Sequence, residues 1–140
     1  MKTVVAILDT MWGWCGAERQ ATPYFIINPK NASGRRLYQF TKGAQLFVTN
    51  SCKELGKTAN DHGVPDPIWL QSNLDLLNNK YGIDILLICG KVAQKTYIKT
   101  DHYFNHGKTE IKFMMHPVAR TWSRAKLDIE EAEIQELIHG

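Results

Sequence analysis

The stretch Thr3-Val4-Val5-Ala6-Ile7-Leu8 decides the fold class of this chain. It is short, rich in β-branched residues and apolar without alternation, as expected of a strand that is covered on both faces. Three further runs, most of them equally apolar, are predicted to be strands as well: Gln45 to Thr49, Asp84 to Cys89 and Glu110 to Met115. Because strands buried on both faces are typical of parallel sheets, we predict a parallel sheet.

Helical patterns separate these strands. Pro67 suits the first turn of a helix and Gly82 suits its end, and an apolar stripe lies between them: Ile68, Leu70, Leu74, Leu77 and Tyr81. Further helices are predicted from Asn31 to Phe40, starting at Ser33-Gly34, and from Lys91 to Lys99, whereas the polar residues 100–108 indicate a loop.

A last helix closes the chain. Asp128 and Glu131 have the spacing of a capping box, which predicts the helix start there. Its predicted buried side consists of Ile129, Ile134, Leu137 and Ile138. Alternating strands and helices with short connections predict one domain, residues 1–140, folded as a three-layer α/β/α sandwich. A four-stranded, mainly parallel sheet in the order 2-1-3-4 suits this pattern.

Composition restricts the class of protein. With 44% hydrophobic and 22% charged residues the sequence is that of an ordinary globular domain, and no apolar run has the roughly 18 residues of a membrane span. The apolar run near Met1 is too short for a signal peptide. We therefore expect a cytoplasmic protein with no membrane partner.

The cysteines and the net charge carry less information. Cys15, Cys52 and Cys89 are scattered, without a C-x-x-C pair or nearby histidines, so that we expect no metal and no cofactor. The net charge of +3 permits binding to nucleic acid but does not by itself indicate it.

Polar residues follow the predicted strands. In open α/β sheets ligands bind at the carboxyl ends of the strands, so that Asp9, Asn50 and His116 are expected to line one cleft. The Asn50 amide has the donors and acceptor needed to read the edge of a pyrimidine. The alternative is a turn residue that binds nearby backbone.

Asp9 and His116 are the candidate catalytic residues. His116 can donate a hydrogen bond to the oxyanion of a departing base, and Asp9 can activate water or stabilise positive charge on a sugar. Their structural alternatives are a surface histidine before a turn and an aspartate that caps the next segment.

Aromatic and basic residues complete the candidate set. Phe25 can stack on a base, although an aromatic at this place is more often core. Trp12 and Trp14 suggest a wedge or, alternatively, packing over the sheet. Basic residues that can contact DNA phosphates, unless they form only a solvated face, are Arg35, Arg36, Arg120, Arg124 and Lys126. The last three follow the His-Pro turn.

Six segments, in chain order, resemble the motifs of the uracil-DNA glycosylase superfamily. They are Ile7 to Gly13 (strand and catalytic turn), Pro23 to Phe25 (stacking aromatic), Ala32 to Leu37 (small-Gly-x-x-Leu helix start), Leu46 to Asn50 (base-reading asparagine), Leu86 to Ala93 (Gly-Lys-x-Ala) and Met115 to Arg120 (His-Pro loop). The resemblance implies that Phe25 stacks on a flipped base, that Asn50 recognises it and that His116 binds its carbonyl. It also implies that the His-Pro loop enters the minor groove.

The function that the resemblance implies is that of a DNA glycosylase, which binds a flipped uracil or modified pyrimidine and hydrolyses its N-glycosidic bond. Counting back from Gly13 places Thr10, which we assign to substrate binding, at the water-activating position, with Asp9 one residue early. That departure favours the first alternative, a non-catalytic module that binds a nucleotide or base on the same fold. The second is a nucleoside- or nucleotide-transforming enzyme that does not touch DNA.

Overall fold

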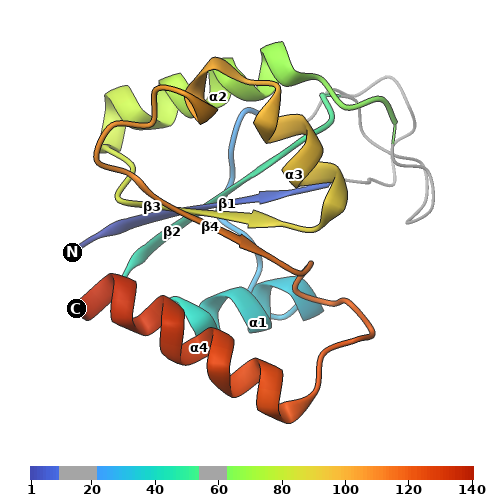
Figure 1. Cartoon of the computed structure of the whole chain (residues 1–140), viewed down its shortest axis with the longest axis vertical. Coiled ribbons are helices and arrows are strands. Elements are labelled where there is room, and N and C mark those ends of the chain that lie inside the picture. Colours follow the sequence, from blue (N-terminus) through green and yellow to red (C-terminus); the bar gives the residue numbers. More distant parts are fainter. Residues whose placement is uncertain (10–21, 54–62) are drawn as a thin grey trace.

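The computed structural model describes residues 1–9, 22–53 and 63–140 (Figure 1). Its elements in chain order are β1 (Thr3–Leu8), α1 (Ala32–Phe40), β2 (Gln45–Asn50), α2 (Pro67–Tyr81), β3 (Ile85–Cys89), α3 (Lys91–Ile98), the 3-10 turn η1 (Asp101–Tyr103), β4 (Glu110–Met114) and α4 (Arg124–His139). Thr10, Trp12 and Trp14 lie outside the described residues. No helix in the described ranges combines the length and the apolar character needed to cross a membrane.

The four described strands form one parallel sheet in the order β2-β1-β3-β4. Helices α1 and α4 cover one face, and α2 and α3 cover the other (Figure 1). The predicted three-layer sandwich and its strand order are therefore confirmed. The register pairs Leu8 with Asn50 and Cys89 with Met114, so that all strands end at the same side of the sheet.

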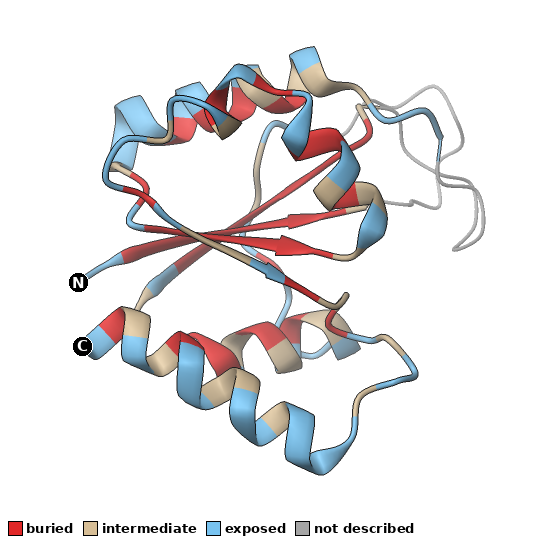
Figure 2. Cartoon of the chain, viewed as in Figure 1, coloured by how far each residue is buried: buried red, intermediate tan, exposed pale blue. Residues whose placement is uncertain are grey.

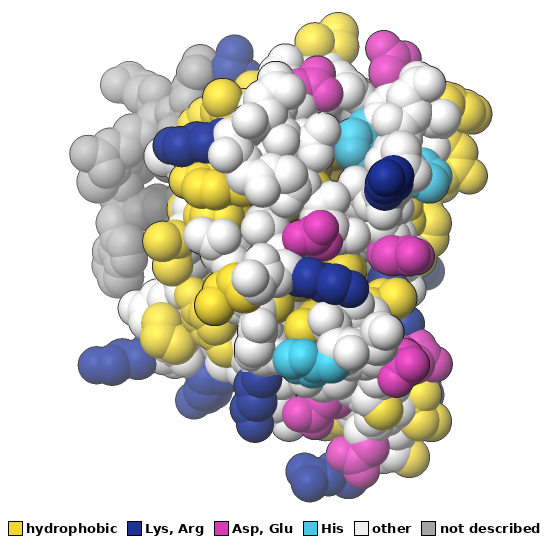
Figure 3. All heavy atoms as spheres, turned by 90° about the vertical axis from the view of Figure 1, so that its left-hand side faces the viewer, with side chains coloured by type: hydrophobic (Ala, Val, Ile, Leu, Met, Phe, Trp, Pro, Cys, Tyr) yellow, Lys and Arg dark blue, Asp and Glu magenta, His cyan; other side chains and the backbone are white. Residues whose placement is uncertain are grey.

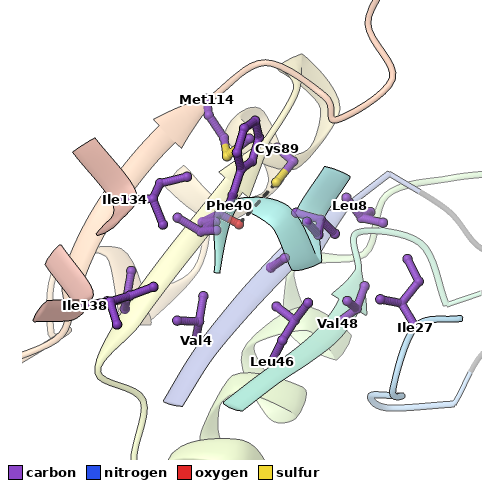
Figure 4. Packing of buried hydrophobic residues seen from close by; sticks show 14 residues of the cluster. Val4, Leu8, Ile27, Phe40, Leu46, Val48, Cys89, Met114, Ile134 and Ile138 are labelled. Atoms are coloured by element: carbon purple, nitrogen blue, oxygen red, sulfur yellow. Dashed lines mark hydrogen bonds between the residues drawn. The ribbon is translucent and has the colours of Figure 1, made fainter. Parts of the chain in front are cut away.

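Two hydrophobic cores flank the sheet. Along β1 the side chains alternate: Val4, Ala6 and Leu8 pack toward α1 and α4, whereas Val5 and Ile7 pack toward α2 and α3. Every strand except the edge strand β4 is buried almost throughout, and the helices bury only the stripe that faces the sheet (Figure 2). In the α1/α4 core, side chains from the strands, both helices and Ile27 point toward one another (Figure 4). Burial of each large apolar side chain contributes about 1.5–3 kcal/mol.

Two helix faces differ from their predicted patterns. Ile68 is 81% exposed and Ile129 is 58% exposed, although both were expected in buried stripes. Ile68 lies two residues before Leu70, about 200° around the helix axis, and Ile129 lies five residues before Ile134, about 140° away. The predicted stripes therefore include apolar residues that the helical period places on the solvent side.

The predicted start of the last helix is also wrong. Helix α4 begins at Arg124, and Ser123 is its N-cap, with its Oγ accepting a hydrogen bond from the Lys126 backbone N–H at 3.2 Å. Asp128 therefore lies one turn inside the helix, where a carboxylate oxygen is 3.5 Å from Nε of Arg124. Ser123 thus binds one of the free backbone N–H groups in the first turn of α4. The capping box at Asp128 was expected to fill this role.

Residues 100–108, predicted as a loop, contain η1 and one buried polar network. His102 is 7% exposed, and its Nδ1 lies 2.7 Å from the Tyr97 hydroxyl. Its backbone N–H donates to Oε1 of Gln71 at 2.7 Å. Burial lowers the pKa of His102, so that the neutral ring is favoured. This network joins η1 to α2 and α3.

Gly34 sets the distance between α1 and the preceding loop. The helix begins one residue before the expected Ser33-Gly34 start, at Ala32, with Asn31 as its N-cap; the Asn31 Oδ1 accepts from Gly34 N–H at 2.6 Å. A Cβ at Gly34 would lie 2.0 Å from the Asn28 carbonyl oxygen. Only a glycine allows this approach of loop to helix.

The substitution Gly34→Ala is therefore expected to lower the free energy of unfolding by about 1–3 kcal/mol, because the clash with Asn28 exceeds the gain in helix propensity of about 1 kcal/mol. Urea unfolding followed by circular dichroism measures this change. Ser33→Ala, one residue earlier in the same helix, is the matched control and should change stability by less than half as much. A Gly34→Ala variant as stable as the wild type would show that the loop moves away at no cost.

Candidate functional site

The carboxyl ends of the four strands carry the predicted site residues. Asp9 follows β1, Asn50 ends β2, Gly90 follows β3 and His116 comes two residues after β4. In the sheet, however, β2 and β4 are the outer strands, so that Asn50 and His116 belong to opposite edges with β1 and β3 between them. Three strand spacings of about 4.8 Å would separate them by about 14 Å, more than the width of one base.

The segments after the outer strands stay in contact with the ends of the inner strands. Beyond β2, the Ser51 backbone N–H lies 3.0 Å from both the Leu8 and the Asp9 carbonyl oxygens, and Cys52 N–H donates to Asp9 at 3.2 Å. The segment after β2 therefore stays hydrogen-bonded to the end of β1.

Beyond β4, the chain turns toward β3. Gly90 N–H donates to the Met114 carbonyl at 2.9 Å, and a Cβ at Gly90 would lie 3.5 Å from Cβ of His116. His116 thus lies beside Gly90, next to the end of β3. Asp9 follows β1, the strand between β2 and β3. That the three residues line one cleft stays a prediction, because residues 10–21 and 54–62 lie outside the described ranges.

Asn50 has an unusual environment. The residue is 1% exposed, and neither its Nδ2 nor its Oδ1 has a hydrogen-bond partner among the described residues. The neighbouring polar side chains do have partners: Thr49 Oγ1 donates to the Pro23 carbonyl at 2.7 Å, and Ser51 Oγ donates to the Leu8 carbonyl at 2.9 Å. A buried polar atom without a partner costs about 1–3 kcal/mol. The turn-residue alternative, in which the Asn50 amide binds nearby backbone, does not describe this geometry.

The direction of the Asn50 side chain follows from strand alternation. Thr49 faces α2, because its Oγ1 accepts from Asn73 Nδ2 at 3.3 Å, whereas Val48 packs in the core beneath α1 and α4. Asn50 therefore points to the α1/α4 face of the sheet, two residues beyond Val48.

Phe25 lies on the same face. Its N–H and C=O pair with the C=O and N–H of Val48, both at 2.9 Å, so that the segment around Phe25 covers the outer edge of β2. Residues directly opposite in such a pair share a face, and the half-buried Phe25 ring packs against the α1/α4 core. Phe25 therefore lies on the same face of the sheet as Asn50. The stacking of Phe25 on a base stays a prediction.

His116 is held in one orientation by its own loop. Its Nδ1 accepts a hydrogen bond from the Val118 backbone N–H at 3.2 Å, and its carbonyl accepts from Ala119 N–H at 3.0 Å and from the Trp122 indole Nε1–H at 2.8 Å. Since Nδ1 accepts, the proton of the neutral ring is on Nε2. An Nε2–H donor is the group needed to stabilise a developing oxyanion.

Trp122 is a positioning residue that the sequence did not indicate. Besides its bond to the His116 carbonyl, its ring packs on Phe40 with centroids 5.8 Å apart. It therefore ties the His-Pro loop to the end of α1. No sequence motif marks a tryptophan six residues after the histidine, because the contact depends on how the loop folds back.

Asp9 is half-buried at the end of β1. Its backbone carbonyl accepts the hydrogen bonds from Ser51 and Cys52, which fixes its position relative to Asn50. The proposed roles of Asp9 and of Thr10, its neighbour outside the described residues, stay predictions.

The predicted DNA-contacting residues are spread over the surface. Arg120, Arg124 and Lys126 are all exposed. Of the three, Arg124 lines a cavity of about 540 Å³, and it does so together with Arg35 and Arg36 of α1. The structure therefore combines Arg124 with two arginines that come far earlier in the chain.

Cys89, the last residue of β3, carries a further reactive group. The thiol of Cys89 is fully buried, and burial raises its pKa above the ordinary value, so that it stays protonated at neutral pH. Within the described ranges, no three His, Cys, Asp or Glu side chains are grouped so that they could hold a metal ion.

Comparison of the chain with protein-family models and with curated proteins found no match.

The substitution Trp122→Phe is expected to keep the contact with Phe40 but to remove the indole donor to His116. The expected loss is about 1 kcal/mol of unfolding free energy, the usual contribution of one hydrogen bond, together with increased mobility of the His116 ring. Urea unfolding and NMR relaxation of the His116 ring measure the two effects. Trp69→Phe on α2 serves as the control, and an unchanged His116 signal in Trp122→Phe would contradict the positioning role.

Proposed function

We propose that the chain is a DNA glycosylase-like protein that binds a flipped uracil or modified pyrimidine at the carboxyl end of its sheet. The buried Asn50 amide carries this proposal. Its Nδ2 and Oδ1 have no partner among the described residues, and the residue as a whole is 1% exposed. Folded proteins rarely retain such an uncompensated group unless a ligand or a solvent molecule satisfies it.

The chemistry of the amide fits the edge of a pyrimidine. Uracil presents a carbonyl acceptor beside an N–H donor, and the two halves of a carboxamide can pair with both in one plane. Phe25 shares the face of Asn50 and offers a ring on which a base can stack. Stacking contributes about 1–3 kcal/mol per base, which offsets the few kcal/mol that flipping costs.

His116 and Asp9 would supply the bond cleavage. When the N-glycosidic bond breaks, electrons move to the base, and the Nε2–H of His116 would stabilise the resulting oxyanion. The sugar becomes electron-poor, and the Asp9 carboxylate would stabilise it or accept a proton from the attacking water. The ends of β2 and β4, which carry Asn50 and His116, are three strand spacings or about 14 Å apart, which leaves room for a base and its sugar between them.

The test is incubation with oligonucleotides that contain uracil, 5-hydroxymethyluracil or cytosine, followed by alkali treatment and by binding measurements on the same strands. Alkali-labile sites at the modified base support the glycosylase. Base-selective binding without cleavage supports the non-catalytic base-binding alternative. A protein that neither cleaves nor distinguishes these strands from a thymine control would contradict the proposal.

Asn50→Asp is expected to change which pyrimidine is preferred, because a carboxylate removes the amide donor and leaves only acceptors. The mismatch at a buried polar pair corresponds to about 1–3 kcal/mol, or roughly a 5- to 150-fold change in the ratio of uracil to cytosine binding. Equilibrium binding to matched oligonucleotides measures the ratio. Phe25→Leu, which leaves the amide intact, is the control and should weaken both strands alike.

Asn50→Leu gives a second expectation that concerns stability. If the amide is kept for a ligand, an apolar side chain of similar size should raise the unfolding free energy by about 1–2 kcal/mol while base selectivity is lost. Chemical denaturation without ligand measures the gain. A destabilised Asn50→Leu variant would show that the amide serves the fold and not a ligand.

A further inference from the structure

A cavity with a basic wall lies between α1, α4 and the loop that joins β4 to α4. Its volume is about 540 Å³. Three arginines line it, Arg35 and Arg36 from α1 and Arg124 from the first turn of α4, and no Asp or Glu is among the described residues of its wall. We call it the arginine groove.

Hydrogen bonds and a packed aromatic ring hold the wall of the groove in place. Arg36 is half-buried, and its Nη1 donates to the Pro117 carbonyl at 3.3 Å, which uses one of five guanidinium donors. Trp122, whose indole also holds the His116 carbonyl, forms part of the wall. Arg36 and Trp122 therefore connect the groove to the His-Pro loop.

Two acidic side chains of α4 that lie near the groove have partners of their own. Asp128 pairs with Nε of Arg124 at 3.5 Å, and Glu131 accepts from Gln39 Nε2 at 3.3 Å. The N–H groups in the first turn of α4, beside Ser123, add a partial positive charge to the three guanidinium groups. Figure 3 shows the side of the molecule that is on the left in Figure 1; in its lower half, which contains the α1/α4 layer, basic and acidic side chains both reach the surface.

We propose that the arginine groove binds the phosphate of a nucleotide, either within a nucleic-acid strand or as a free nucleotide. Guanidinium groups form bidentate hydrogen bonds with phosphate oxygens, and three of them in one cavity without a lining carboxylate favour an anion over any cation or neutral ligand. This inference rests on the proposed function, since it supplies the phosphate contact for a strand whose base reaches Asn50. It assigns that contact to Arg35 and Arg36 besides Arg124, and leaves Arg120 and Lys126 outside the groove.

The experiment compares the wild type with Arg35→Gln/Arg36→Gln/Arg124→Gln. Fluorescence anisotropy measures the affinity for labelled 12-nucleotide strands, one with uracil and one with thymine, and for the corresponding duplexes, between 50 and 200 mM salt. Each lost phosphate contact lowers the log–log salt slope by about 0.7 for a single strand and about 0.9 for a duplex. We expect a loss of at least tenfold at low salt and a slope lower by about two or more. Uridine and uridine 5′-monophosphate, tested as competitors, distinguish a free nucleotide from a strand.

The matched control is Lys95→Gln/Lys99→Gln/Lys108→Gln, which removes the same charge from exposed positions of the α3 side. Equal losses in both variants would overturn the groove, since net charge alone would then explain the loss of affinity.

Because Arg36 also binds the Pro117 carbonyl, the double variant Arg35→Gln/Arg124→Gln and thermal unfolding separate binding from folding. Within this design, a triple variant with unchanged affinity refutes the groove even if wild type prefers uracil. Equal wild-type affinity for uracil and thymine strands, together with no cleavage at uracil, instead refutes the proposed function and leaves the groove standing.

Discussion

The parallel pairing of β1 with both β2 and β3 is the constraint on which the rest of the structure depends. All six residues of β1 are buried, and its side chains enter both cores. A strand covered on both faces and hydrogen-bonded on both edges has one register, because a shift by one residue would exchange its two faces. That register places Leu8 beside Asn50 and brings every strand end to one side. The position of the candidate site is therefore a consequence of the most buried segment of the chain.

The sequence predicts those parts of the fold that a pattern of apolar residues marks. Continuous apolar runs predicted the strands, and the alternation of strands and helices predicted the layers, because these signals are local. Helix faces and starts were less predictable. Ile129 is apolar but lies on the solvent side, and Ser123 caps α4 ahead of the expected Asp128, since two capping signals in one stretch compete and packing decides between them.

The positions of the candidate residues at the strand ends were predictable, but their arrangement in space was not. Asp9 and His116 come after β1 and β4, and Asn50 is the last residue of β2, close to the strand end that the sequence indicates. The contact of His116 with Gly90 and the hydrogen bonds from Ser51 and Cys52 to the Asp9 carbonyl depend on the loops after the strands, which no periodicity marks. The same holds for Trp122 and for the meeting of the arginines in the groove, because long-range contacts through loops have no local signature.

The two faces of the sheet carry different polar and aromatic groups. On the α2/α3 side, Tyr97, His102 and Gln71 form a hydrogen-bonded network that joins η1 to both helices. On the α1/α4 side lie the Asn50 amide without a partner, the Phe25 ring, the wall of the arginine groove and the indole that holds the His-Pro loop. A ligand that used these groups together would contact α1, α4 and that loop at once. Its binding would then be coupled to the packing of the Trp122 indole on α1, because the same contact fixes the His-Pro loop and one wall of the groove.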